Sequence, residues 1–136
     1  MTGARRKSRA VILQALYEID SSGHNSGDVV SRLLLDKGLS EENEAFVRQQ
    51  VDGVVQSKKQ LDEHIKRFAP SWPITQLPAI DRNILRLAIF ELLIDNKVPV
   101  NITINEAVEL AKKFGSDNSA RFINGVLSSV STLVTG

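Results

Sequence analysis

Residues 102–134, ITINEAVELAKKFGSDNSARFINGVLSSVSTLV, predict two consecutive helices joined by a tight polar turn. Thr103 and Glu106 have the T-x-x-E spacing of a capping box, which places the start of the first helix at Thr103. Gly115 then supplies the left-handed residue on which helices commonly end. The polar residues 116–119 follow as candidate caps for the second helix. The stretch therefore predicts a helical hairpin with a polar corner.

Each helix of this hairpin carries an apolar stripe at helical spacing, and we expect both stripes to face the core. The first stripe comprises Ile104, Ala107, Val108, Ala111 and Phe114, and the second comprises Ile123, Val126, Leu127, Val130 and Val134. The corner between them carries Lys112, Lys113, Asn118, Ser119 and Arg121, with Phe114 and Phe122 nearby.

The rest of the chain has the helical period wherever a period is clear, which predicts an all-α fold. Apolar residues in the longest segment alternate in steps of four and three, as in a coiled coil. The pattern lasts only about three heptads, so we favour packing into a bundle. The predicted helices are 4–21, a short one from a cap at Asp28 to Gly38, a long one from a cap at Ser40 to about Ala69, and a central one at 80–94 that is apolar nearly all round.

Three of the four prolines lie in PSWPITQLP, residues 70–78. Proline lacks the N–H donor and disfavours helix in the preceding residue, so the long helix must end at about Ala69. We predict that this linker separates two subdomains, about 4–69 and about 79–134, which share a core within a single domain of residues 1–136.

The composition is that of a soluble globular protein, with 42% hydrophobic and 24% charged residues in a chain of 136. The chain has no cysteine, which excludes disulfides, thiolate metal sites and cysteine nucleophiles. No apolar run approaches the roughly 18 residues of a membrane span. We therefore expect a cytoplasmic protein that does not associate with membranes.

The residue types that usually catalyse reactions or bind metals are present, but their spacing in this chain fits neither role. His24 and His64 have no second ligand at helical spacing, and neither G-x-G-x-x-G nor G-x-x-x-x-G-K-[ST] occurs. We expect no metal, no cofactor and no catalytic residue, and thus a protein that is not an enzyme.

A local cluster of positive charge favours nucleic-acid binding, although the net charge is only +1. Four basic residues fall within the first nine positions, and no acidic residue precedes Glu18, so this segment could neutralise phosphates. Tyr17, Phe114 and Phe122 could stack on bases if their rings are exposed. Two other interpretations stay open at this point: a basic terminus that is merely solvated, and phenylalanines that belong to the core.

The chain resembles the NusB family of bacterial transcription antitermination factors. The resemblance covers essentially the whole chain and rests on four segments in a fixed order: ARRKSRA at 4–10, ALYEID at 15–20, AIDRNILRLAIFEL at 79–92 and, most specifically, VPVNITINEAVELAKKFGSDNSARFINGVL at 98–127. A related domain precedes the catalytic part of some ribosomal RNA cytosine methyltransferases. A chain of 136 residues has no room for that part, so we expect the free-standing factor.

The resemblance implies an all-α fold of two packed three-helix subdomains. It also implies binding to the boxA element of ribosomal RNA leader transcripts together with NusE, a ribosomal protein of the small subunit. This pair on RNA, through other Nus factors, would help RNA polymerase to read through terminators. Family members occur as monomers and as homodimers, and the sequence leaves both open. The alternatives are a helical protein-interaction scaffold with a solubilising basic arm, or a free-standing relative of the methyltransferase RNA-binding domain.

The residues that the resemblance implies fall into an RNA-binding set and a partner-binding set. The RNA-binding set is Arg5, Arg6, Lys7, Arg9 and Tyr17 near the N-terminus and Lys113, Asn118, Ser119, Arg121 and Phe122 at the hairpin corner, and the partner-binding set is Asp81, Arg82 and Glu91 as exposed polar positions of the central helix. Both parts of the RNA-binding set must share one face. Asn118 stands where family members often have an acidic residue, which should strengthen RNA binding slightly.

Overall fold

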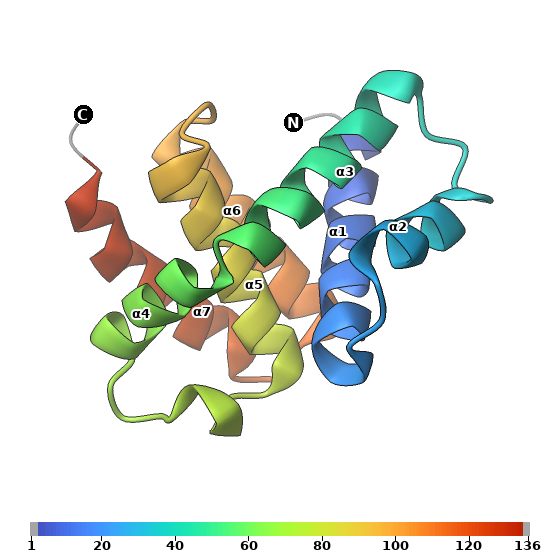
Figure 1. Ribbon diagram of the computed structural model, residues 1–136. Helices are drawn as coiled ribbons and strands as arrows, with labels where there is room; N and C mark the ends of the chain where they lie inside the picture. Colours follow the sequence, from blue (N-terminus) through green and yellow to red (C-terminus); the bar gives the residue numbers. More distant parts are fainter. Residues whose placement is uncertain (1–2, 135–136) are drawn as a thin grey trace. The chain divides into compact units, whose positions relative to one another are not determined.

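The structure, a computed structural model, describes residues 3–134, and every regular element in that range is helical (Figure 1). The prediction of an all-α fold is confirmed. None of these helices combines the length and the apolar character that a membrane span needs. The predicted domain span also includes residues 1, 2, 135 and 136, which lie outside the described part of the chain. The α-helices are α1 (Gly3–Ser22), α2 (Ser26–Leu34), α3 (Glu41–Gln56), α4 (Lys58–Phe68), α5 (Ala79–Ile89), α6 (Val100–Phe114) and α7 (Ser119–Val130), with a π-helical turn η2 (Phe90–Ile94) and 3-10 turns η1 (Ile74–Gln76) and η3 (Ser131–Leu133).

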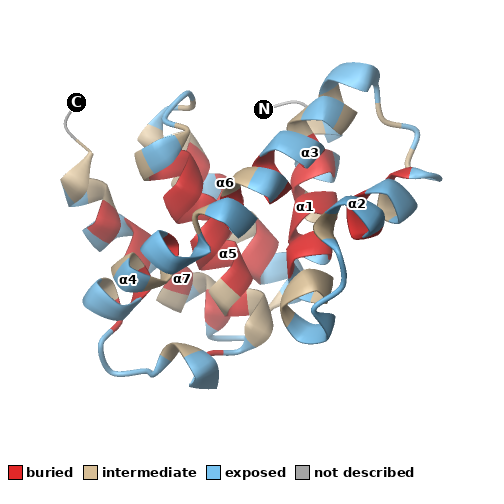
Figure 2. Ribbon diagram, viewed as in Figure 1, coloured by how far each residue is buried: buried red, intermediate tan, exposed pale blue. Residues whose placement is uncertain are grey.

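The chain divides into two compact units between Gln56 and Ser57. In the first unit α1 contacts both α2 and α3, and α2 contacts α3. The apolar stripe of α1 faces α2 and α3, and Figure 2 shows buried residues on several turns of the helix. Its residues are Val11, Ile12, Ala15 and Leu16, each at most 3% exposed.

Helices α2 and α3 both begin at polar caps. The sequence predicted the cap of α3 correctly and that of α2 incorrectly. The N–H of Asn43 donates to Ser40 Oγ at 3.1 Å, which confirms Ser40 as the cap of α3. The predicted cap of α2, Asp28, is wrong, because its own N–H donates to Asn25 Oδ1 at 3.1 Å. Asn25 is therefore the cap, and α2 starts earlier than the charge pattern indicates.

The predicted long helix is interrupted at Ser57, where φ is −99° and ψ is 7°. The second part, α4, contacts α5 and α7, so residues 57–69 belong to the second unit and not to the first subdomain in which the sequence placed them. Leu61 and Ile65 continue the apolar spacing of α3, so the sequence does not reveal the break. The apolar residues of α3 face α1 and α2, whereas those of α4 face α5 and α7. In its described part, the second unit thus holds the four α-helices α4 to α7, one more than the resemblance implies.

Helix α5 is the centre of the second unit and contacts α4, α6 and α7. Its side chains Ile84, Leu85 and Ile89 are completely buried, as its nearly all-apolar sequence predicted. The helix widens at its end, because the N–H of Asp95 donates to the carbonyl of Phe90, five residues back, at 2.9 Å.

A partly buried ion pair connects α4 to α5. Arg86 Nε donates to Asp62 Oδ1 at 2.7 Å and Nη2 donates to Oδ2 at 3.1 Å, while Nη1 reaches Asn83 Oδ1 at 3.3 Å. The Arg86 side chain is 6% exposed and the Asp62 side chain 23%. This two-pronged geometry is the strong form of a charged hydrogen bond, so the pair fixes α4 on the central helix.

The hairpin of α6 and α7 exists, but the predicted capping box is wrong. Helix α6 begins at Val100, and the N–H groups of Ile102 and Thr103 both donate to the carbonyl of Pro99. Pro99 is the N-cap of α6, with ψ at 141°, so the helix starts before the predicted cap and Thr103 is buried within it.

Gly115 ends α6, but its φ is −92°, so the predicted left-handed conformation is wrong. Glycine is needed there because a Cβ would lie 2.5 Å from Ser119 Oγ and 2.8 Å from the carbonyl oxygen of Ala111. The stripe of α7 is confirmed for Ile123, Val126, Leu127 and Val130, which are at most 6% exposed, whereas Val134 lies beyond the helix and is half-buried.

Glu18, near the end of α1, accepts a hydrogen bond from Arg32 of α2 and lies 3.5 Å from His24 Nδ1. The Arg32 hydrogen bond lowers the pKa of the Glu18 carboxyl, with a smaller opposing effect of desolvation. The folded state therefore binds a proton less readily than the unfolded state. The resulting stabilisation is complete above the unfolded pKa and is lost as pH falls through the folded pKa.

Glu18→Gln is expected to reduce stability at pH 7, and its difference from wild type should vanish as the pH falls through the folded pKa of Glu18. Urea unfolding followed between pH 7 and pH 3 measures this difference. Glu63→Gln, at an exposed position of α4, is the control. A wild-type advantage over Glu18→Gln that stays constant across this range would show that the ion pair is not its source.

Candidate RNA-binding surface

The predicted basic residues at the N-terminus, Arg5, Arg6, Lys7 and Arg9, all lie in the first turns of α1, and we call them the basic start. Arg6 and Lys7 are exposed, so a phosphate can reach their side chains, although Lys7 Nζ also donates to the carbonyl of Lys37 at 2.5 Å. Arg5 is half-buried, and Arg9 is only 2% exposed. The helix thus presents two of its four basic side chains to solvent and turns the other two towards α3.

Arg5 and Arg9 both approach the ring of Phe46, which α3 supplies. The guanidinium carbon of Arg5 lies 3.9 Å from the ring centroid, and that of Arg9 lies 5.4 Å from it. Both distances are typical of cation–π contacts. Arg9 is buried and its guanidinium contacts the ring of Phe46, so it connects α1 to α3, and its contact with RNA stays a prediction.

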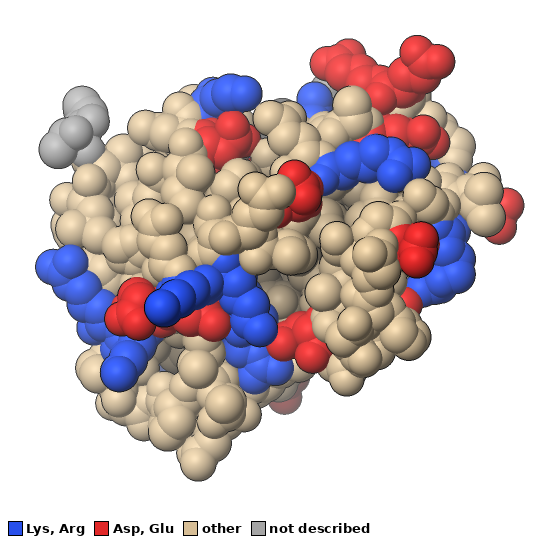
Figure 3. Space-filling view, viewed as in Figure 1, with Lys and Arg blue, Asp and Glu red and all other residues tan. Residues whose placement is uncertain are grey.

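An acidic turn faces the basic start. Arg5 Nη2 lies 3.7 Å from Glu42 Oε1, and Glu41 and Glu44 belong to the same first turn of α3. Figure 3 shows acidic atoms gathered over the start of this helix. The sequence analysis assigned no site role to Glu42 or Phe46. Their i, i+4 spacing does place them on one helix face, but only the fold shows that this face meets Arg5.

Tyr17 has 42% of its surface exposed, so the predicted stacking ring is accessible. It lies ten residues beyond Lys7 on α1, about 15 Å along the helix axis. A single RNA strand of a few nucleotides is long enough to cover this distance.

The hairpin corner belongs to the second unit and offers both charges and rings. Lys113, Asn118 and Arg121 are exposed, and Phe122 is half-buried. Phe114 is 41% exposed, and the ammonium of Lys113 lies 5.3 Å from its ring centroid. Phe114, which was considered as a stacking residue but not assigned to the site, thus has an accessible ring beside a cation.

Ser119 was predicted to contact RNA, but it is only 1% exposed and holds the corner together. Its Oγ accepts from the N–H of Ser116 at 2.9 Å and donates to Asp81 Oδ1 at 2.7 Å. The start of α7 packs on the start of α5, where Asp81 accepts from the hydroxyl, and the contact of Ser119 with RNA stays a prediction.

The predicted partner-binding residues are less accessible than the sequence indicated. Asp81 and Glu91 are 5% and 4% exposed, so their assignment as exposed positions is wrong. Helix α5 is covered by three other helices, which bury even its polar side chains. Arg82 is half-buried, and its Nη1 donates to the carbonyls of Ile74 and Leu77, both at 3.1 Å. Arg82 therefore anchors the proline-rich segment 70–78.

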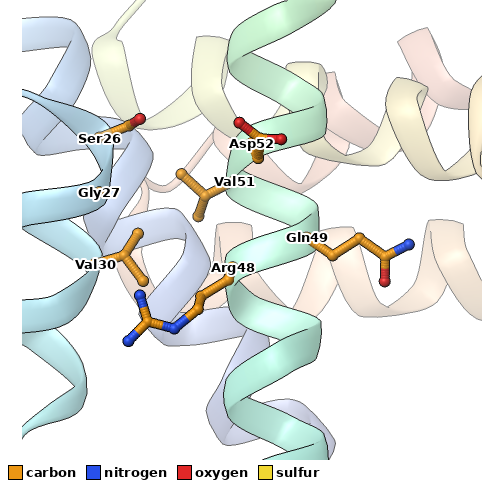
Figure 4. Close-up of a pocket in the computed structure, with 7 residues that line it drawn as sticks. All are labelled: Ser26, Gly27, Val30, Arg48, Gln49, Val51 and Asp52. Atoms are coloured by element: carbon orange, nitrogen blue, oxygen red, sulfur yellow. The ribbon is translucent and has the colours of Figure 1, made fainter.

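A pocket of about 360 Å³ lies between α2 and α3, and Figure 4 shows the Arg48 side chain directed towards α2 within it. Arg48 Nη1 donates to Ser31 Oγ at 3.3 Å. The lining residues are Ser26, Gly27, Val30, Arg48, Gln49, Val51 and Asp52. None of the predicted site residues is among them, so the pocket is separate from the candidate RNA surface.

The candidate surface consists of exposed cations and accessible rings, which is the combination that binds single-stranded nucleic acid. The basic start lies in the first unit and the hairpin corner in the second. That the two share one face stays a prediction.

Comparison with known proteins identifies the relatives of this chain. The pattern of the NusB family matches residues 6–132. The transcription antitermination protein NusB of Dehalococcoides mccartyi strain CBDB1 is 59% identical over 131 residues, which cover 96% of this chain and 92% of that protein. Among solved structures, NusB of T. maritima matches with a TM-score of 0.91 and 29% identity over 100% of this chain and 96% of its own. A crystal structure of antitermination factors NusB and NusE in complex with double-stranded RNA matches with a TM-score of 0.88 and 26% identity over 97% of this chain and 98% of the matched chain.

Proposed function

The chain belongs to the NusB family, and we propose that it is a transcription antitermination factor that binds boxA RNA of ribosomal RNA leader transcripts together with NusE. The main support is the exposed pair Arg6 and Lys7 on the first turns of α1, in a fold that a relative uses in a complex with NusE and RNA. Through other Nus factors, the protein would act on RNA polymerase in the cytoplasm. In this proposal the protein binds RNA and NusE and catalyses no reaction. It acts either as a monomer or as a homodimer.

The exposed residues divide the work of binding RNA between charge and stacking. Arg6 and Lys7, with Lys113 and Arg121 at the corner, neutralise phosphates, and Asn118 offers a neutral polar contact. Tyr17, Phe114 and Phe122 supply rings, and each stacked base is worth roughly 1 to 3 kcal/mol. Arg9 and Ser119 are buried beneath these residues. Arg9 packs on Phe46 of α3, and Ser119 bonds to Asp81 of α5.

NusE binds, in this proposal, at the start of α5. Arg82 lies there and fixes the segment 70–78, in which Trp72 is 53% exposed. An accessible tryptophan in a segment that an arginine anchors suits a protein interface, because both residue types are enriched in interfaces. Asp81 is buried at the start of α5, where it accepts a hydrogen bond from Ser119, and Glu91 is buried in η2 beyond the other end of α5.

Replacing Arg6 and Lys7 together by alanine is expected to weaken RNA binding by about 10- to 30-fold at 0.1 M salt. Each phosphate contact on a single strand contributes about 0.7 to the slope of log affinity against log salt, so the slope should become shallower by about 1.4. A titration of fluorescent boxA RNA with the protein–NusE pair, at several salt concentrations, measures both quantities.

The control is Lys58→Ala with Lys59→Ala, which removes the same charge from exposed positions of α4. We expect the control to change the affinity much less than the test pair. Equal losses for the two double variants would mean that only the net charge matters. Unchanged affinity in both would favour a protein-interaction scaffold with a solubilising arm.

A further inference from the structure

Two groups of α3 hold the guanidinium of Arg5 in different ways. The ring of Phe46 lies 3.9 Å from its central carbon, and the carboxylate of Glu42 lies 3.7 Å from its Nη2. The ring contact is made at the central carbon of the guanidinium, whereas the carboxylate lies beside a terminal nitrogen. The two contacts therefore use different parts of the same group.

The edge of a guanidinium is where phosphates bind, because its N–H donors point outward in the plane. A separation of 3.7 Å exceeds the length of a good hydrogen bond, so the pair with Glu42 is a Coulombic contact that an incoming anion can replace. The Glu42 side chain is 86% exposed, whereas the Arg5 side chain is 27% exposed. Glu42 can thus move away while Arg5 stays on its ring.

We propose that Glu42 is a built-in competitor of RNA, whose carboxylate occupies the position at Arg5 that an RNA phosphate takes in the complex. This inference rests on the proposed function. RNA binding then exchanges one anion, the Glu42 carboxylate, for another, an RNA phosphate, at Arg5. The contact with Glu42 therefore lowers the affinity of the basic start for RNA.

The position of Glu42 makes the exchange reversible. Glu42 lies in the first turn of α3, where the helix dipole favours a carboxylate whether or not it contacts Arg5. Phe46 keeps the guanidinium in place after the carboxylate leaves, because the cation–π contact does not involve Glu42. Glu41 and Glu44 in the same turn add repulsion that RNA must also overcome.

A double-mutant cycle tests the proposal on the complete chain with NusE. Glu42→Gln is expected to tighten boxA RNA binding about two- to fivefold at 0.1 M salt, the range for one exposed ion pair. The salt slope should steepen by up to about 0.7, because the contact of Arg5 with a phosphate would then release a counterion from the RNA without freeing a carboxylate. In the background of Arg5→Met, which keeps the packing on Phe46 without the charge, Glu42→Gln should leave the affinity unchanged.

The outcomes separate this proposal from its alternatives. Asp52→Asn makes the same charge change at the other end of α3 and should have little effect in either background. An equal gain from Glu42→Gln in both backgrounds would overturn the proposal, because Glu42 would then repel RNA without occupying Arg5. No gain from Glu42→Gln, while Arg6→Ala with Lys7→Ala still weakens binding, would overturn it and leave the proposed function intact. A wild-type pair that does not bind boxA RNA would refute both.

Discussion

Asp62→Ala is expected to lower the free energy of unfolding by about 3 kcal/mol. The substitution removes both acceptors that Arg86 Nε and Nη2 use, while the guanidinium stays 6% exposed against the central helix. Removing one partner of a buried pair costs about 3 to 5 kcal/mol, because the remaining charge is left in a poorly solvated place. We expect the lower end, since the Asp62 side chain is 23% exposed and water can replace part of what is lost.

Urea unfolding followed by circular dichroism measures this loss. Glu63→Ala is the matched control, because it removes a neighbouring carboxylate from an exposed position of the same helix. A second variant replaces both partners, Asp62→Leu with Arg86→Met, and should regain most of the stability because no charge is then buried alone. A loss in Asp62→Ala no larger than that in Glu63→Ala would show that the ion pair does not hold α4 on α5.

Gly115→Ala is expected to lower the free energy of unfolding by about 2 kcal/mol, in the range for an added carbon without room. The new Cβ would lie 2.5 Å from Ser119 Oγ, 2.6 Å from Ser119 Cβ and 2.8 Å from the carbonyl oxygen of Ala111. Ser119 cannot move easily, because its hydroxyl bonds to Asp81 and to the N–H of Ser116. The hairpin corner must therefore open, and RNA binding should weaken with it.

Two further variants identify the cause. Gly125→Ala in the exposed interior of α7 meets nothing within 4 Å, and we expect it to stabilise the protein by about 0.5 to 1 kcal/mol. Gly115→Asn should be at least as harmful as Gly115→Ala if space is the constraint, since φ is −92°. A clearly milder effect of asparagine would instead indicate a left-handed conformation, which asparagine tolerates better than alanine. Thermal unfolding of the three variants makes the comparison.

The parts of the fold that the sequence predicted well depend on periodicity. The stripe of α7 and the apolar circumference of α5 need only a helix and a core to be buried, so their positions follow from residue spacing. The cap at Ser40 is equally local, because its partner is the N–H three residues later.

The errors arose where distant residues decide the local structure. Ser119 and Asp81 are 38 positions apart, and their hydrogen bond buries two polar groups that look like surface residues in the sequence. The break at Ser57 is hidden because Leu61 continues the apolar period into a helix that packs on other partners. The T-x-x-E signal was outweighed by Pro99, which starts α6 earlier.

The candidate site shows the same division. The charges of Arg6 and Lys7 were predicted from the run of basic residues, and their exposure agrees with that role. The ring of Phe46 and the carboxylate of Glu42 became visible only when α1 and α3 were found packed together, because both lie far along the chain from Arg5.

Whether this chain binds boxA RNA through the basic start of α1 is tested most directly by one salt-dependent titration. Labelled boxA RNA and a permuted RNA of equal composition are each titrated with the wild-type protein and NusE. We predict tighter binding of boxA RNA, with an affinity that falls linearly on a log–log plot as salt rises. Equal affinity for the two RNAs, or an affinity for boxA RNA that salt does not change, would contradict the proposed function.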